Sequence, residues 1–132
     1  MTNQVKSENI IASKSYAFAL EIVMLYKYLS TEKKEFVLSK QVLRSGTSIG
    51  ASVYEALSAE SKRDFVHKLG ISLKEARETS YWLQLLNDSH YIPETMYDVF
   101  QAKCHEITKI LSSIILTTKE KYFKPNQNTP NS

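Results

Sequence analysis

The fold is decided by residues 97–118, YDVFQAKCHEITKILSSIILTT, where apolar or small side chains recur at alternating intervals of three and four residues. This period places them on one face of an α-helix and is typical of a coiled-coil seam. The positions on this face are Tyr97, Phe100, Cys104, Ile107, Leu111, Ile114 and Thr118. A helix with one continuous apolar face has to bury it against other elements, so the segment predicts a helical bundle.

The same period predicts three further helices upstream of this segment. They cover about residues 9–29, 38–56 and 61–88. Only 3 Gly and 3 Pro occur in 132 residues, too few for the frequent turns of a β-sandwich. We expect an all-α fold, an antiparallel up-down-up-down four-helix bundle formed by residues 9–123. Residues 1–8 and 124–132 are expected to be disordered.

Composition and charge exclude several classes of protein. The net charge of +3 permits an acidic partner but does not demand one. A single cysteine, Cys104, excludes an internal disulfide framework and a cysteine-rich zinc site. The longest uncharged stretch, residues 45–54, is far shorter than the roughly 20 residues of a membrane span, and MTNQVKSENI lacks the pattern of a secretory signal. We expect a cytoplasmic protein without membrane contact.

The residue types that catalysis needs are present but are not grouped. His67, His90 and His105 are far apart and lack the helical i, i+4 pairing of metal ligands. Cys104 lies on the apolar seam, where a buried structural thiol is expected rather than a nucleophile. No glycine-rich phosphate loop occurs. We therefore expect no enzyme activity, no metal and no cofactor.

The helix predicted at residues 38–56 carries two signs of close helix contacts. Gly46 and Gly50 lie one turn apart on one face, and each costs about 1 kcal/mol relative to alanine in a helix interior. A neighbouring helix that passes close to both would offset this cost. If the next helix folds back as a hairpin, Arg44 comes level with Glu75 or Glu78. We predict an ion pair there, and we favour a role in fixing helix register over a functional role.

The helix predicted at residues 61–88 carries a basic stripe on the face opposite to its inward, apolar face. This stripe consists of Arg63, His67, Gly70, Lys74, Arg77 and Tyr81, spaced by four and three residues. The stripe holds three permanent cations, a titratable histidine and an aromatic ring, with no acid. Such a face can follow a phosphate backbone, so we predict that its side chains contact nucleic acid. The alternative interpretation is a solvated face with a basic bias.

Two segments make the chain recognisable. LRSGTSIGASVYEA (residues 43–56) and DFVHKLGISLKEARETSYWLQLL (residues 64–86) resemble the bacterial proteins encoded in intervening sequences of 23S rRNA genes, sometimes labelled as ribosomal proteins. The resemblance covers about residues 8–120, and one departure is Ser52, where relatives usually have Asn. It implies a four-helix bundle and, from several family members, a ring-shaped homopentamer. A related branch, the accessory proteins of diversity-generating retroelements, implies a basic pentamer that binds a reverse transcriptase and nucleic acid.

Apolar side chains beyond the predicted core point to self-association. They are Tyr16, Val23, Tyr26 and Trp82, and together they exceed what one small bundle can cover. Our first hypothesis is a non-catalytic homo-oligomer, with a pentamer expected, that binds RNA or another nucleic acid through basic helix faces. The alternative is a protein-interaction scaffold without nucleic-acid binding, whose basic stripe is solvated or packs against an acidic protein partner.

Overall fold

The computed structural model describes residues 2–123, and this part of the chain contains four α-helices and no strands. The helices are α1 (Asn3–Thr31), α2 (Leu38–Leu57), α3 (Lys62–Asp88) and α4 (Glu94–Tyr122). The prediction of an all-α fold with four helices is confirmed. No helix within residues 2–123 is both long and apolar enough to span a membrane.

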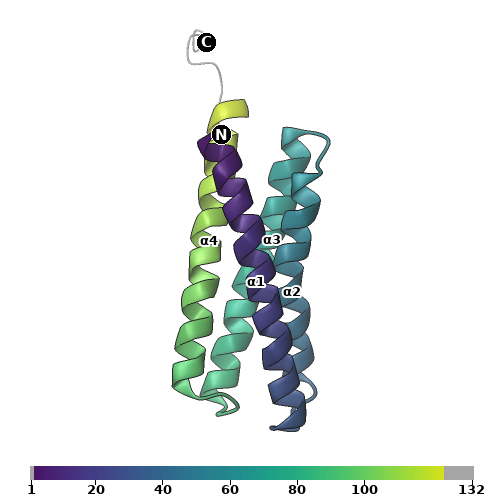
Figure 1. The fold of residues 1–132 in the computed structure, drawn as a ribbon, viewed down its shortest axis with the longest axis vertical. Helices are drawn as coiled ribbons and strands as arrows, with labels where there is room; N and C mark the ends of the chain where they lie inside the picture. Colours follow the sequence, from purple (N-terminus) through teal and green to yellow (C-terminus); the bar gives the residue numbers. More distant parts are fainter. Residues whose placement is uncertain (1, 124–132) are drawn as a thin grey trace, which may run out of the picture.

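The four helices lie side by side along the long axis of the molecule (Figure 1). The α1–α2 and α3–α4 connections lie at one end, and the α2–α3 connection lies at the other end, where α1 also begins (Figure 1). α2 packs against α1 and α3, whereas α4 packs against α3 and, with the fewest contacts of any pair, against α1. Of these neighbouring helix pairs, α1 and α4 are therefore the least closely packed.

The start of α1 differs from the sequence prediction. α1 begins at Asn3, so the expectation of a disordered segment up to residue 8 is wrong for the residues from Asn3 onward. The Thr2 hydroxyl accepts a hydrogen bond from the Val5 N–H (3.1 Å), and the Gln4 amide donates to the Thr118 hydroxyl on α4 (3.3 Å). The Thr2 cap and the contact between Gln4 and Thr118 extend α1 beyond its buried apolar positions, the first of which is Ile11. The predicted disordered tail, 124–132, lies outside the described residues.

A buried carboxylate starts α2. Glu35 is only 7% exposed, although it lies in the connection before the helix. Its side chain accepts hydrogen bonds from the N–H groups of Val37 (2.7 Å), Leu38 (2.9 Å) and Ser39 (3.0 Å). These donors have no partner within the helix, so one side chain satisfies three N–H groups at the start of α2 and places a negative charge at the positive end of the helix dipole.

The core is formed by the helix faces that the sequence period predicts. On α4, the seam from Cys104 to Thr118 is buried at every predicted position, while Tyr97 and Phe100 at its start are half-buried. The Phe100 ring meets the Phe18 ring of α1 edge to face, with centroids 6.2 Å apart. Because these faces are covered, the functional candidates lie on the outer faces and at the helix ends.

Candidate functional site

Gly46 and Gly50 allow α1 to approach α2 closely. A Cβ atom at Gly46 would lie 2.8 Å from both Cγ atoms of Ile22, and one at Gly50 would lie 3.2 Å from the Ser15 carbonyl oxygen. Gly70 differs, because no atom outside its immediate backbone lies within 4 Å of its Cβ position. The close neighbour is thus α1, which the sequence pattern alone does not identify.

Small buried polar side chains tie α3 to the helices beside it. The Ser72 hydroxyl donates to the Ile49 carbonyl of α2 (2.8 Å), and the Thr79 hydroxyl lies 3.0 Å from the Ser45 hydroxyl. On the α4 side, the Cys104 thiol donates to the Ala76 carbonyl (3.2 Å). Burial raises the pKa of the Cys104 thiol to about 11, and a backbone hydrogen bond from Ser80 only partly opposes this. The thiol is therefore a packing group rather than a nucleophile.

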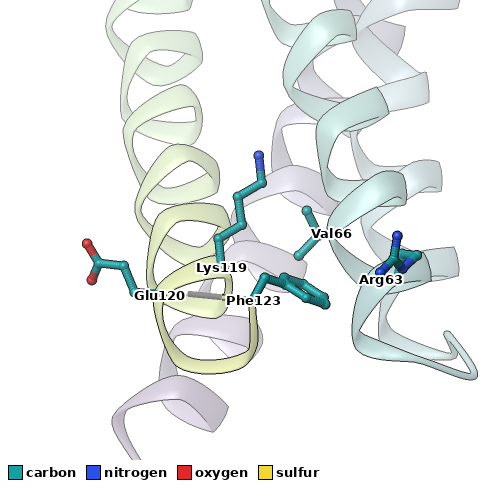
Figure 2. A pocket seen from close by; sticks show the side chains of 5 residues that line it. All are labelled: Arg63, Val66, Lys119, Glu120 and Phe123. Carbon is teal, nitrogen blue, oxygen red and sulfur yellow. The ribbon is translucent and has the colours of Figure 1, made fainter. Parts of the chain in front are cut away.

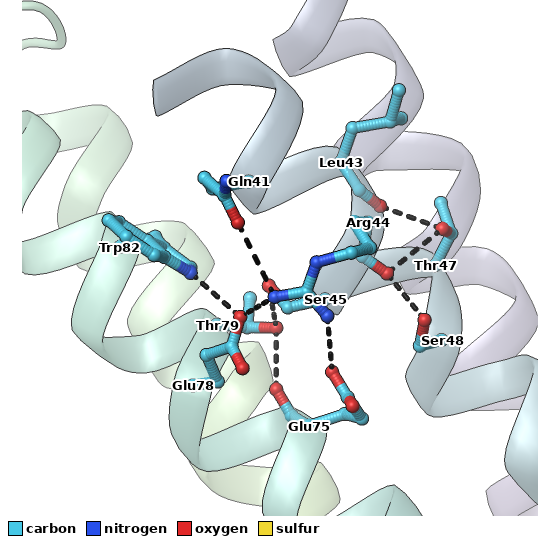
Figure 3. A network of polar contacts seen from close by, with 10 residues as sticks. All are labelled: Gln41, Leu43, Arg44, Ser45, Thr47, Ser48, Glu75, Glu78, Thr79 and Trp82. Atoms are coloured by element: carbon cyan, nitrogen blue, oxygen red, sulfur yellow. Dashed lines mark hydrogen bonds and ion pairs between the residues drawn. The ribbon is translucent and has the colours of Figure 1, made fainter. Parts of the chain in front are cut away.

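The structure brings Arg44 together with both predicted carboxylates (Figure 3). Arg44 Nη1 lies 3.4 Å from Glu75 Oε2, and its Nη2 pairs with Glu78 Oε2. The same Glu78 oxygen accepts a hydrogen bond from the Trp82 indole (2.9 Å), while Gln41 Oε1 lies 3.5 Å from Nη2. The two carboxylates are held by a guanidinium and an indole, so the cluster links α2 to α3 instead of presenting a free acid or base.

The basic stripe forms an exposed row along the outer face of α3. Arg63, His67, Lys74 and Arg77 are exposed, and Tyr81 is 58% exposed. At 1.5 Å per residue, the row from Arg63 to Tyr81 extends about 27 Å. Gly70, which has no side chain, lies near its middle between His67 and Lys74.

The cations of this stripe are not neutralised by the described part of the chain. Ion pairs form instead at Arg44, at Lys68 with Glu55, and between α1 and α4, where Lys14 meets Glu106 and Lys103 meets Glu21. Within residues 2–123, none of the stripe's arginine, lysine or histidine side chains pairs with a carboxylate. The outer face of α3 therefore holds positive charge that is available to an external partner.

The predicted interface residues have different environments. Tyr16 is 67% exposed, Val23 and Tyr26 are half-buried, and Trp82 is half-buried against the core with its indole N–H bonded to Glu78. The structure adds residues that the sequence analysis missed. Leu20, Met24 and Val99 are more than half exposed, and Met24 and Val99 line a groove of about 370 Å³ between α1 and α4. The spacing of Tyr16, Leu20 and Met24 at i, i+4 and i+8 was the available signal.

The described residues do not assemble a metal site. No group of three or more His, Cys, Asp or Glu side chains in residues 2–123 is close enough to hold a metal ion. His67 is exposed on α3, His90 is exposed in the α3–α4 connection with a φ of 66°, and His105 is exposed on α4.

The fold and the charge distribution define the class of this protein. It is a small all-α protein of four helices, and its helix α3 exposes a row of cations that pair with no carboxylate of residues 2–123. The chain belongs to the 23S rRNA-intervening sequence protein family, which matches residues 7–113. The family resemblance predicted from residues 43–56 and 64–86 is thus confirmed.

A solved structure supports the same conclusion. A protein with unknown function from the S23 ribosomal protein family of Bacteroides thetaiotaomicron is 53% identical to this chain. The similarity covers 83% of this chain and 98% of that chain, with a TM-score of 0.83. A comparison with curated proteins gives no match.

Proposed function

We propose that this protein is a non-catalytic, cytoplasmic homo-oligomer that binds RNA or another nucleic acid through the outer face of α3. The observation that carries the proposal is the row of exposed cations Arg63, Lys74 and Arg77, which pair with no carboxylate of residues 2–123. His67 and Tyr81 lie in the same row. Cations spaced along about 27 Å of helix can each meet a phosphate, and the release of condensed counterions then drives binding.

The proposed oligomer is built from antiparallel up-down-up-down bundles, with the ring-shaped homopentamer as the expected form. The support is the apolar surface of α1 and the open groove between α1 and α4, with Tyr16, Leu20 and Met24 exposed. An apolar surface of this kind is typical of an interface. Five copies would also multiply the net charge of +3 fivefold and so strengthen attraction to a polyanion.

Binding to a structured RNA tests the nucleic-acid part of the proposal. The assay is the fluorescence anisotropy of a labelled RNA hairpin titrated with protein at low salt. The triple variant Arg63→Gln, Lys74→Gln and Arg77→Gln should bind about a hundredfold more weakly, because up to three phosphate contacts are lost. Unchanged affinity would contradict the assigned surface, and no binding by the wild type would favour the protein-interaction scaffold.

A matched control separates the surface from the net charge. The variant Lys27→Gln, Lys40→Gln and Lys109→Gln removes the same charge from exposed positions on α1, α2 and α4. It should retain most of the wild-type affinity, because these lysines lie outside the stripe. Light scattering tests the oligomer separately, and a strict monomer at micromolar concentration would contradict it.

A further inference from the structure

A pocket lies where the start of α3 meets the end of α4 (Figure 2). It is lined by Arg63, Val66, Lys119, Glu120 and Phe123, and its volume is about 540 Å³. Pockets that bind small organic groups fall between roughly 300 and 1,000 Å³, so its size suits a ligand group rather than a water molecule. Arg63 is also the first residue of the basic stripe, so the pocket lies at one end of that stripe.

The chemistry of the pocket is apolar inside and cationic at its edge. The Phe123 ring, 40% exposed, and Val66 supply the apolar surface. Arg63 and Lys119 supply positive charge, and neither pairs with a carboxylate of residues 2–123. Among the lining residues within 2–123, Glu120 is the one acid, and Figure 2 shows its carboxylate turned away from Phe123 and Arg63.

Aromatic rings and cations are also paired in the surroundings of the pocket. The Arg63 guanidinium carbon lies 5.8 Å from the centroid of the Phe123 ring. The neighbouring Tyr122, 44% exposed, has Lys62 Nζ 4.9 Å and Lys121 Nζ 5.3 Å from its ring centroid. Two partly exposed rings among cations form the arrangement with which proteins bind the bases and phosphates of a single strand.

We propose that this pocket receives an unpaired nucleobase from a single-stranded segment that adjoins the nucleic acid whose phosphates follow the basic stripe. The inference rests on the proposed nucleic-acid binding and adds the kind of nucleic acid. A flat unsaturated ring can stack on Phe123 beside Val66, and its flanking phosphates meet Arg63 and Lys119. Bases within a duplex are already stacked and paired, so only an unpaired base can enter.

A pair of RNA hairpins tests the inference, each closed by a flexible non-nucleotide linker in place of a loop of bases. One is blunt, and the other carries a single-stranded extension of adenosines. The wild type should bind the extended hairpin about tenfold more tightly, the effect of one stacked base. Phe123→Leu should remove this difference and leave binding of the blunt hairpin unchanged, whereas Phe123→Trp should retain it. Tyr54→Leu, at an exposed aromatic on α2, is the matched control and should change neither affinity.

The outcomes distinguish this inference from the proposal beneath it. Equal affinity of the wild type for both hairpins would overturn the nucleobase pocket and leave the α3 interface intact. Failure to bind either hairpin at low salt would overturn both. A direct readout comes from the Phe123→Trp variant, whose fluorescence should be quenched by a single-stranded oligoadenylate more than that of the wild type, which has only Trp82. Equal quenching would contradict stacking at position 123.

A deoxyadenosine oligonucleotide of the same length identifies the sugar. Stronger quenching by the RNA strand would assign the site to RNA, and equal quenching would assign it to single strands of either kind. Because Phe123 lies at the exposed end of α4, circular dichroism should show the same helix content in all three variants. This measurement keeps a loss of binding separate from a loss of fold.

Discussion

Substituting alanine for Gly46 on α2 measures the close packing of α1 on α2, and the same substitution at Gly70 on α3 serves as the reference. In a helix interior the change stabilises by about 1 kcal/mol through backbone propensity alone. At Gly70 nothing lies within 4 Å of the new Cβ, so Gly70→Ala should raise the free energy of unfolding by about that amount. At Gly46 the Cβ would lie 2.8 Å from both Cγ atoms of Ile22, closer than non-bonded carbon atoms approach.

Ile22 cannot move easily to relieve this contact. Its side chain is fully buried, and its branching at Cβ restricts rotation about χ1. Overpacking of this kind costs about 1–3 kcal/mol, so Gly46→Ala should range from neutral to about 2 kcal/mol destabilising after the propensity gain. The difference between the two variants, about 1–3 kcal/mol, isolates the contact because their propensity terms cancel.

Urea unfolding followed by far-UV circular dichroism measures both variants, at one protein concentration because association affects apparent stability. A double-mutant cycle then identifies the contact. Ile22→Ala removes the Cγ atoms, so it should lower the free energy of unfolding less in the Gly46→Ala background than in the wild type. Ile22→Val keeps both Cγ atoms and removes only Cδ1, which lies 3.0 Å from the Cβ position, so it should give less relief. Equal effects of alanine at Gly46 and Gly70 would refute the packing argument.

Three further predictions concern single side chains. Glu35→Ala should lower the free energy of unfolding by about 1–2 kcal/mol in urea unfolding, because three N–H groups of the first turn of α2 lose their acceptor; no change would exclude the capping role. Arg44→Gln should lower the free energy of unfolding by about 1 kcal/mol or less, because the ion pair is half-exposed. High salt should reduce this difference from the wild type, and a shift in Trp82 fluorescence would report the loss of order at Glu78. Cys104, with its pKa raised to about 11 from 9.0, should resist Ellman's reagent in the folded protein below pH 9.0, and fast labelling without unfolding would contradict its burial. Its contribution to stability is fully present below pH 9.0 and should be lost as the pH rises through about 11, since the unfolded chain releases the thiol proton first.

The helices and their inward faces could be predicted because both follow from a local period. The placement of Arg44 opposite Glu75 and Glu78 follows from the register of a short hairpin, which is also a local property. The start of α1 could not be predicted, because the contact that extends it, Gln4 with Thr118, joins residues far apart in sequence. For the same reason, the sequence could not indicate that α1 is the helix that packs on Gly46.

In the candidate site, too, some features follow from a local sequence pattern and others depend on how the helices pack. The basic stripe repeats with the helical period and is therefore visible in the sequence. The pocket beside Phe123 is not, because it depends on which turn of α3 meets the end of α4. The capping role of Glu35 was also missed, since its carboxylate reaches the first turn of α2 from outside the usual cap position, two residues before Val37.

The salt dependence of RNA binding tests the central claim most directly. Affinity for the blunt hairpin is measured across a series of salt concentrations for the wild type and for the Arg63, Lys74 and Arg77 triple variant. The slope of log K against log salt should be shallower for the variant by about 2–3, because up to three phosphate contacts are lost. An identical slope for both proteins would show that the outer face of α3 does not bind the nucleic acid.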